Sequence, residues 1–374
     1  MTMGKRVAAT SAENSLPSGT LVRKGSDRSV TTHGWLRMAK VATILLFLGW
    51  SVGQVCLDAT WFTGLLFYIP SPAIFAILGT GTVLGLRGAT GESSQRISIT
   101  TVMALLAAGI MTFGVENQFS ASAKADGQNT DPANIATIVH WNTCSGSFGQ
   151  NQVRKKLLSL DADFYLLSEP PYAWPSWIQE DRHSVLWLRK MMAVAHNGDT
   201  LEKQPLVDRD ECQIWSVRWT HNGKTLHIFA VDLTSNLSQH RNPLLRELNQ
   251  LIHEYKPDLI LGDFNAPRRS IQLQRLPKGY AHAYEVAGGE FGYTWPVPLP
   301  IYAIDQCIVG SDVDVLSYDL QTSFSDHRLQ RLEYVQQSPK KTVNQQQKFR
   351  LSLVNRLTTW TRLPYFDNRK KHRN

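Results

Sequence analysis

Three apolar runs lie between residues 39 and 119, and they divide the chain into parts that fold in different surroundings. The first, residues 39–57, is nineteen residues long, and its only charge is Lys40 near its start. At a rise of about 1.5 Å per residue it is long enough to cross a bilayer as a helix. A signal peptide is the alternative, but the run is long for one and more apolar sequence follows it.

The other two runs are less regular. Residues 62–86 contain Pro70 and Pro72, so a helix there begins near the second proline or is kinked. Residues 97–119 contain one acid, Glu116, near their end. We expect about three transmembrane helices, because three such runs in a soluble protein would have too little surrounding chain to cover them.

Basic residues are distributed unevenly around these runs. The loop between the first two has Asp58 and no Lys or Arg, whereas Arg87 and Arg96 lie between the second and the third. The positive-inside rule therefore places the amino terminus in the cytoplasm and everything after residue 119 outside it. With only two crossings, the following domain would lie in the cytoplasm instead. The basic residues that precede the first span are Lys5, Arg6, Arg23, Lys24, Arg28, Arg37 and Lys40.

The net charge of +8 belongs to the two ends of the chain. Residues 1–40 hold seven Lys or Arg and two acids, and residues 335–374 hold ten and one. Residues 132–334 hold nineteen basic residues and twenty-three acids, a net charge of −4. The charge therefore gives no support to a nucleic-acid-binding surface on the middle of the chain.

Composition divides the chain into five segments. We expect residues 1–38 to be a disordered basic cytoplasmic arm and residues 39–119 to be the transmembrane region. Residues 120–134 are small and polar, which is typical of a linker. Residues 135–334 have the mixed pattern of a folded domain. Residues 335–374 are a basic tail, either solvated or carrying an amphipathic helix that lies on anionic lipid.

Strand-like and helix-like stretches alternate after the linker. Apolar residues on one face predict a helix over residues 242–254, and the Asn222-Gly223 pair predicts a hairpin turn. Hairpins combined with helical crossovers indicate an α/β domain with mixed sheets. The other expected elements are a short helix over residues 152–160 and strands over residues 135–141, 163–168, 213–219, 225–231, 258–262 and 303–309.

Polar side chains stand at the ends of several expected strands. Sites assemble at the edge of a sheet where strands end, so these side chains are expected to lie together. Asp263 and Asn265 are two positions apart and point to the same side of an extended chain. Carboxylate and amide oxygens suit Mg²⁺ or Mn²⁺. The residues in question are Asn142, Glu169, Asp263, Asn265 and Asp305, with Ser325-Asp326-His327 after a polar loop.

These motifs resemble those of the endonuclease/exonuclease/phosphatase superfamily, the DNase I-like proteins. The resemblance covers residues 135–334 and is most specific at Gly262-Asp263-Phe264-Asn265 and Ser325-Asp326-His327. It implies a four-layered α/β sandwich of two mixed β-sheets flanked by helices, here preceded by a bundle of about three transmembrane helices. In layout the chain is similar to a membrane-anchored bacterial subgroup, the VanJ-like and YafD-like proteins.

The resemblance also implies roles for individual residues. Glu169 is expected to be the principal metal ligand, with Asn142 assisting and Asp326 next to the metal. Asp263 would position or deprotonate the attacking water, and Asn265 would hold a phosphate oxygen.

A histidine and its partner complete the implied site. His327 would bond to the scissile phosphate, and Asp305 would fix its tautomer. The family often has a second histidine at the end of the strand over residues 225–231, where this chain has Asp232. Asp232 is a candidate for that role, and His282 and His240 are the alternatives.

The sequence predicts a membrane-anchored, Mg²⁺- or Mn²⁺-dependent phosphodiesterase or phosphatase in which water attacks phosphorus in line. Arg268 and Trp295 are candidates for substrate binding; solvated surface and internal packing are the respective alternatives. Anchoring favours a lipid-linked or small phosphorylated substrate by proximity. An extracytoplasmic nuclease is the second hypothesis, and a non-catalytic membrane binding protein on the same fold is the third.

Overall fold

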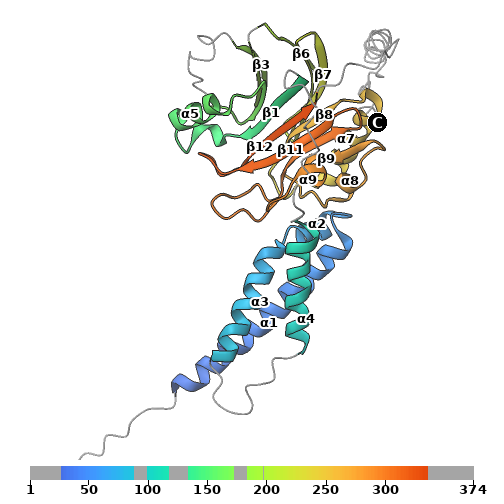
Figure 1. Ribbon diagram of the computed structural model, residues 1–374. Coiled ribbons are helices and arrows are strands. Elements are labelled where there is room, and N and C mark those ends of the chain that lie inside the picture. The colour runs from blue at the N-terminus through green and yellow to red at the C-terminus, as the bar shows by residue number, and fades with distance from the viewer. Residues whose placement is uncertain (1–26, 88–98, 118–133, 172–182, 197, 336–374) are drawn as a thin grey trace, which may run out of the picture. The chain divides into compact units, whose positions relative to one another are not determined.

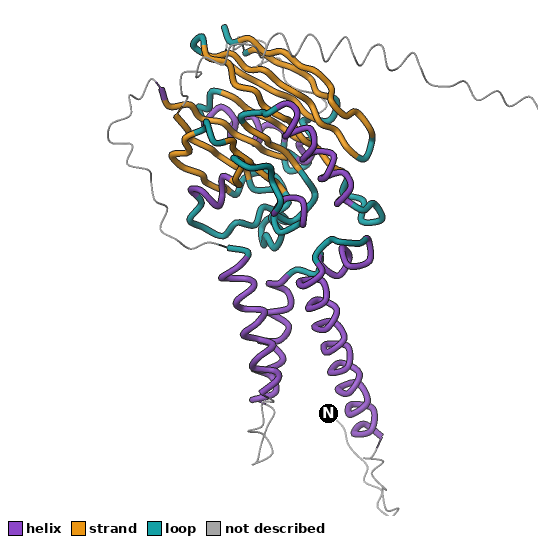
Figure 2. The backbone as a smooth tube through the Cα atoms, turned by 90° about the vertical axis from the view of Figure 1, so that its right-hand side faces the viewer, coloured by secondary structure: helices purple, strands orange, loops and turns teal. Residues whose placement is uncertain are grey.

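The computed structural model describes residues 27–87, 99–117, 134–171, 183–196 and 198–335. The basic tail, nearly all of the expected linker and most of the amino-terminal arm lie outside these residues. The chain forms two compact units, residues 1–48 and residues 49–374. Figure 2 shows that the described residues before 118 are mainly helical, whereas the strands all belong to the part that follows.

The helices differ from the three expected spans. Helix α1 (Asp27–Cys56) begins inside the arm that was expected to be disordered, so residues 27–38 are helical. Its segment Met38–Cys56 is long and apolar enough to cross a membrane. The third run forms α4 (Ile99–Ile110) and a π-helical turn (Met111–Val115), and its apolar part is shorter than a span.

The second run is not one helix. It forms α2 (Trp61–Phe67) and α3 (Ser71–Arg87), which are bent by 52° at the break between them. Pro70 lies in that break, where its ring and its missing N–H prevent a continuous helix. Among the described residues, one helix could therefore cross a membrane, or two if the bent pair is a single span. By their length and composition, the described helices therefore provide fewer membrane spans than the three expected.

The domain after the linker contains two six-stranded sheets. The strand order is β11-β12-β1-β2-β4-β3 in the first and β5-β6-β7-β8-β10-β9 in the second. One pair in each sheet is parallel, β1 with β2 and β7 with β8, and the other pairs are antiparallel. The first sheet consists of β1 (Ile135–Asn142), β2 (Phe164–Ser168), β3 (Ser184–Leu188), β4 (Met191–Ala195), β11 (Asp314–Gln321) and β12 (Leu329–Val335). The second consists of β5 (Thr200–Arg209), β6 (Cys212–His221), β7 (Lys224–Leu233), β8 (Leu259–Asp263), β9 (Tyr280–His282) and β10 (Asp305–Gly310).

Helices cover the outer faces of both sheets. Strand β2 is apolar and buried on both faces: Phe164 and Leu166 pack in the core between the sheets, whereas Leu167 packs beneath α5 (Gln150–Leu160). Leu245 and Leu248 of α7 (Arg241–Tyr255) pack on the second sheet. Figure 1 shows α5 on one side of the paired sheets and α7 and α8 (Ile271–Gln274) on the other, and the short helix α9 (Ala283–Ala287) follows β9. The expected four-layered sandwich is confirmed for this domain.

Candidate active site

A glycine brings three carboxylates together at one edge of the second sheet. Gly262 has φ 150°, and a Cβ placed on it would lie 1.8 Å from the carbonyl oxygen of Val231. Only glycine allows β8 to approach β7 this closely. The pairing then sets Asp263 opposite both Asp232 on β7 and Asp305 on β10.

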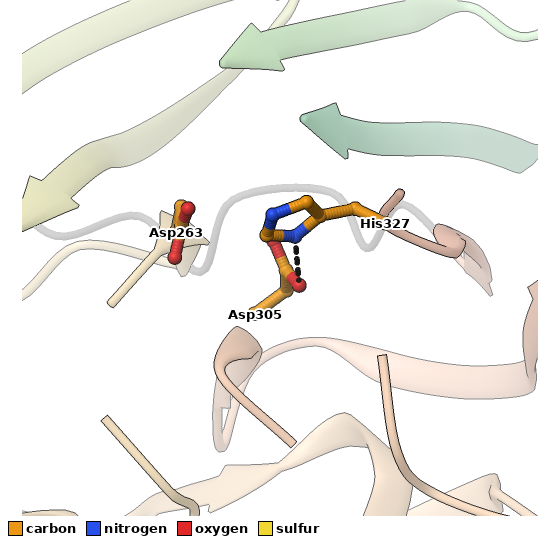
Figure 3. A group of neighbouring side chains, drawn as sticks. All are labelled: Asp263, Asp305 and His327. Carbon is orange, nitrogen blue, oxygen red and sulfur yellow. Dashed lines mark hydrogen bonds and ion pairs between the residues drawn. The ribbon is translucent and has the colours of Figure 1, made fainter. Parts of the chain in front are cut away.

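His327 lies against this group of acids. Its Nδ1 is 2.9 Å from Oδ2 of Asp305, and both side chains are buried. Figure 3 shows the second ring nitrogen facing the side of the site on which Asp263 lies. Ligand atoms of Asp263, Asp305 and His327 all lie within 4.8 Å of one another. The structure thus brings together the three residues that the sequence assigned to acid–base chemistry.

The pKa values of these groups are shifted in different directions. Burial opposes the charge on His327, but the Asp305 carboxylate outweighs it and raises the pKa of His327 to about 9. Burial, reinforced by the negative charge of Asp305, raises the pKa of Asp263 to about 8. Burial also raises the pKa of Asp232 to about 7. At neutral pH the site therefore holds a protonated imidazole beside two carboxyl groups that exchange protons near that pH.

The first sheet contributes Asn142 and Glu169. The Asn142 Nδ2 donates to Oδ2 of Asp263 at 3.0 Å and, more weakly, to Oε1 of Glu169 at 3.4 Å. Its Oδ1 accepts a hydrogen bond from the backbone N–H of Cys144 at 2.9 Å. Asn142 therefore joins the ends of the two sheets across the site.

Two of the expected site residues have unusual backbones. Glu169 and Asn265 both have φ 47°, in the left-handed region that non-glycine residues rarely adopt. The backbone N–H of Asn265 donates to Oδ1 of Asp263 at 2.9 Å, and its side-chain amide donates to the carbonyl of Leu233 at 2.8 Å. Such strained residues are found at functional sites more often than elsewhere, because packing must hold them in place.

Asp326 and Trp295 are hydrogen-bonded to each other beside His327. The indole Nε1 of Trp295 donates to Oδ2 of Asp326 at 3.0 Å, and the indole lies 6.4 Å from the ring of His327, centroid to centroid. The carboxylate of Asp326 thus has one oxygen fixed by the indole. Trp295 is half-buried, in keeping with either substrate contact or packing.

Other candidates lie elsewhere. The guanidinium of Arg268 is buried over the ring of Tyr284 and donates to the carbonyl of Gly292 at 3.1 Å, so it is not solvated surface. His282 is buried on β9 and bonds to the carbonyl of Leu273, and His240 bonds to the carbonyl of Asp58. Of the three candidates for the second histidine's role, Asp232 is the one paired beside Asp263.

The structure adds three residues, Tyr68, Tyr302 and Cys144, that sequence reasoning missed. The Tyr68 hydroxyl donates to the backbone carbonyl of Asn265 at 2.9 Å, and the Tyr302 hydroxyl donates to the carbonyl of Tyr68 at 2.8 Å. Burial, reinforced by the carboxylates of Asp326 and Glu169, raises the pKa of the Cys144 thiol. None of the three carried a signal, because Tyr68 lies in an apolar run and Tyr302 and Cys144 lie in no motif.

The donor atoms fit a hard divalent cation. Five carboxylates, those of Glu169, Asp232, Asp263, Asp305 and Asp326, belong to the residues just described, and Oδ1 of Asp305 is buried without a hydrogen-bond partner. Mg²⁺ and Mn²⁺ prefer carboxylate oxygens, together with amide oxygens, as their ligands.

Comparisons with known proteins relate the chain to one family. No curated protein matches the chain. Among solved structures, the chain is similar to humanized D. rerio TDP2 carrying 14 mutations, at 18% identity and a TM-score of 0.45, over 54% of this chain and 100% of that one. It is also similar to TDP2 from C. elegans, at 14% identity and a TM-score of 0.46, over 72% of this chain and 94% of that one. A third similar structure is an endonuclease/exonuclease/phosphatase family protein from Bacteroides thetaiotaomicron, at 13% identity and a TM-score of 0.41, over 55% of this chain and 98% of that one. The model of the Endonuclease/Exonuclease/phosphatase family matches residues 139–327, just over half of the chain. The chain therefore belongs to the endonuclease/exonuclease/phosphatase family.

Proposed function

We propose that the protein is a membrane-anchored, Mg²⁺- or Mn²⁺-dependent phosphoester hydrolase that acts on a lipid-linked or small phosphorylated substrate. Hydrolysis of phosphoester bonds is the activity of its family. The observation that carries the proposal is the buried pair of His327 and Asp305 beside Asp263. A carboxyl group that titrates near neutrality can accept the proton of the attacking water, and a fixed imidazolium beside it can stabilise the charge on the phosphate.

The chain's own residues divide the work as follows. Asp263 accepts the proton of the attacking water, for which a pKa of about 8 is suitable. His327, held by Asp305 through Nδ1, donates a hydrogen bond from Nε2 to the phosphate and stabilises its developing charge. Asn265 holds a phosphate oxygen, and Asp232 assists Asp263 in place of the family's second histidine.

The metal belongs with Glu169, Asn142 and Asp326. Nδ1 of His327 is hydrogen-bonded to Asp305, and Asp263 is the proposed base, so the close group of Asp263, Asp305 and His327 is assigned to proton transfer and phosphate binding. When bound, the metal would neutralise charge on the phosphate and leaving oxygens.

A second observation favours a substrate in the membrane. Asp58, in the segment between α1 and α2, accepts the backbone N–H of Ile271 at 2.7 Å through Oδ1, and Tyr68 bonds to Asn265. Glu116 and Asn117, at the end of the third apolar run, bond to Tyr293 and Gly292 at 2.5 Å and 2.6 Å. Two loops that form the site are therefore hydrogen-bonded to the ends of the apolar helices. A site held in this way is close to a substrate embedded in the same bilayer.

The test is a substrate panel for the full-length protein in detergent micelles with Mg²⁺ or Mn²⁺. The substrates are phospholipids, polyprenyl pyrophosphate, a chromogenic phosphodiester and plasmid DNA. Turnover of a lipid or of the small ester, lost in His327→Ala, supports the proposal. Preferential cleavage of DNA would indicate the nuclease, and failure to turn over any substrate would indicate a non-catalytic binding protein.

A further inference from the structure

A second cluster of histidine and carboxylate side chains lies at the end of the sandwich away from the catalytic residues. Asp163 precedes β2, and His196 follows β4 of the same sheet. His221 ends β6 of the other sheet, at the hairpin end of β6, and Asp199 precedes β5. The catalytic Asp232 pairs with Gln213 near the opposite end of β6. The cluster therefore joins the two sheets but belongs to a different site.

The two imidazoles face one carboxylate oxygen. Oδ1 of Asp163 is 3.7 Å from Nε2 of His196 and 3.9 Å from Nε2 of His221. Both distances are too long for a hydrogen bond. They are slightly longer than the separation of about 3.3 Å between ligand atoms in a tetrahedral zinc site with bonds of about 2.0–2.1 Å.

The surroundings of His221 fix which nitrogen is available. Its Nδ1 lies 2.9 Å from Oδ1 of Asp199, so this nitrogen carries the proton. The side-chain amide of Asn222 lies 2.8 Å from Nε2, where it can donate to the lone pair. In the neutral ring Nε2 is therefore the nitrogen that can bind a metal, once the Asn222 amide is displaced, and it lies 3.9 Å from Oδ1 of Asp163.

Three of the four side chains are held in place. Asp163 accepts the backbone N–H of Thr137 at 2.7 Å, and Asp199 accepts the indole N–H of Trp219 at 2.7 Å. A carboxylate on the far nitrogen of a histidine is the usual outer-shell partner of a metal-bound imidazole. The His196 side chain is 42% exposed and its ring centroid is 6.4 Å from that of His221, so His196 is the side chain that must move for one metal to contact all three ligands.

We propose that Asp163, His196 and His221 form a second metal site, for a transition metal of the Zn²⁺ class, that clips the two sheets together and has Asp199 as its orienting carboxylate. Two imidazoles and one carboxylate are ligands that zinc accepts, and the exposed side of the cluster leaves a position for water. The site is independent of the proposed hydrolase activity.

The test uses the full-length protein without an affinity tag, in detergent, with excess Mg²⁺ to occupy the catalytic site. Zn²⁺ is added and measured by equilibrium dialysis, and Co²⁺ is added for its visible absorption bands. We expect zinc binding that raises the melting temperature, loss of both effects in His196→Gln and His221→Gln, and affinity lowered by about 10–100-fold in Asp199→Asn. His253→Gln, a change of an exposed histidine on α7, is the matched control and should bind like the wild type.

Activity with Mg²⁺ separates this proposal from the proposed function. His196→Gln should keep the wild-type rate, because the residue lies at the other end of the sheets, and that rate also shows that the variant folds. Equal zinc binding by the wild type and by both histidine variants would overturn the site. So would a wild type that binds no Zn²⁺ and whose melting temperature responds only to pH, since the cluster would then be a set of ion pairs.

Discussion

At the scale of single residues, the account depends on His327 and Asp305 acting as a unit. Each of His327→Ala and Asp305→Ala should lower kcat by about 10²–10⁴-fold, the usual range for a positioned acid–base group. The double variant should be barely slower than either single variant, because the second change removes a partner whose function is already lost. Steady-state rates of the four proteins test this. Losses that multiply would show that the two residues act separately.

The pH dependence follows from the same pair. Turnover needs protonated His327, so kcat should fall as the pH rises through its pKa of about 9. In Asp305→Asn the carboxylate that raises this pKa is gone, while burial, which lowers it, remains. The fall in rate should therefore move to lower pH, near or below the ordinary histidine value of about 6.5. If the fall in kcat at high pH stays in place in this variant, a group other than His327 causes that fall.

The residues of this site could be predicted because each stands beside a buried strand. Asp263 and Asp305 were found in this way, and pairing across β8 and β10 makes them neighbours. Asp232 was found as a departure from the family, but only the strand register shows that it lies beside Asp263. The burial of Arg268 could not be foreseen, since an arginine after a motif has no periodicity to show that it stacks on Tyr284.

At the scale of elements, the connection between α2 and α3 is hydrogen-bonded to the loop that carries Asn265. Tyr68→Phe removes one hydrogen bond to Asn265, which is worth about 1 kcal/mol net. Because this bond holds a residue at φ 47°, we expect kcat to fall by about 3–10-fold with a small change in melting temperature.

Trp61→Phe is the matched control for that variant. It breaks the bond from the indole to the carbonyl of Leu237, 3.2 Å long, which leads from α2 to a loop outside the site. We expect its kcat to stay close to that of the wild type. Equal effects of the two variants on kcat would mean that these bonds only stabilise the fold.

The longer helices and six strands of the domain were predicted closely, the apolar helices were predicted less well, and β3, β4, β5, β9, β11 and β12 were not predicted. Helix α7 differs from its expected range by one residue at each end, because its apolar stripe and its hairpin neighbours are local signals. The Asn222-Gly223 turn is found where expected, with φ 48° and 74°. The break at Pro70 and Pro72 in the second apolar run was expected, but hydropathy does not show that Thr60 caps a separate short helix before it.

At the scale of the whole molecule, the side of the membrane on which the domain lies is a prediction from the basic residues. A reporter that is active only outside the cytoplasm should function when fused after residue 125 and fail after residue 92. The reason is the excess of Lys and Arg before the first run and the Arg87 and Arg96 pair beyond the second. Among the described residues, one single helix is long and apolar enough to cross a membrane, whereas this prediction needs three crossings, so the test is a demanding one. Activity at 92, or silence at 125, would place the domain in the cytoplasm.

The central claim is that this chain is a metal-dependent phosphoester hydrolase whose metal is held by Glu169. It is tested most directly by turnover of the chromogenic phosphodiester and the phospholipids by the full-length protein, with chelator and with Mg²⁺ or Mn²⁺ restored. We predict that chelation abolishes turnover, that either metal restores it, and that Glu169→Gln needs far more metal for half-maximal rate while it melts at nearly the wild-type temperature. Full activity of Glu169→Gln in chelator would contradict the account.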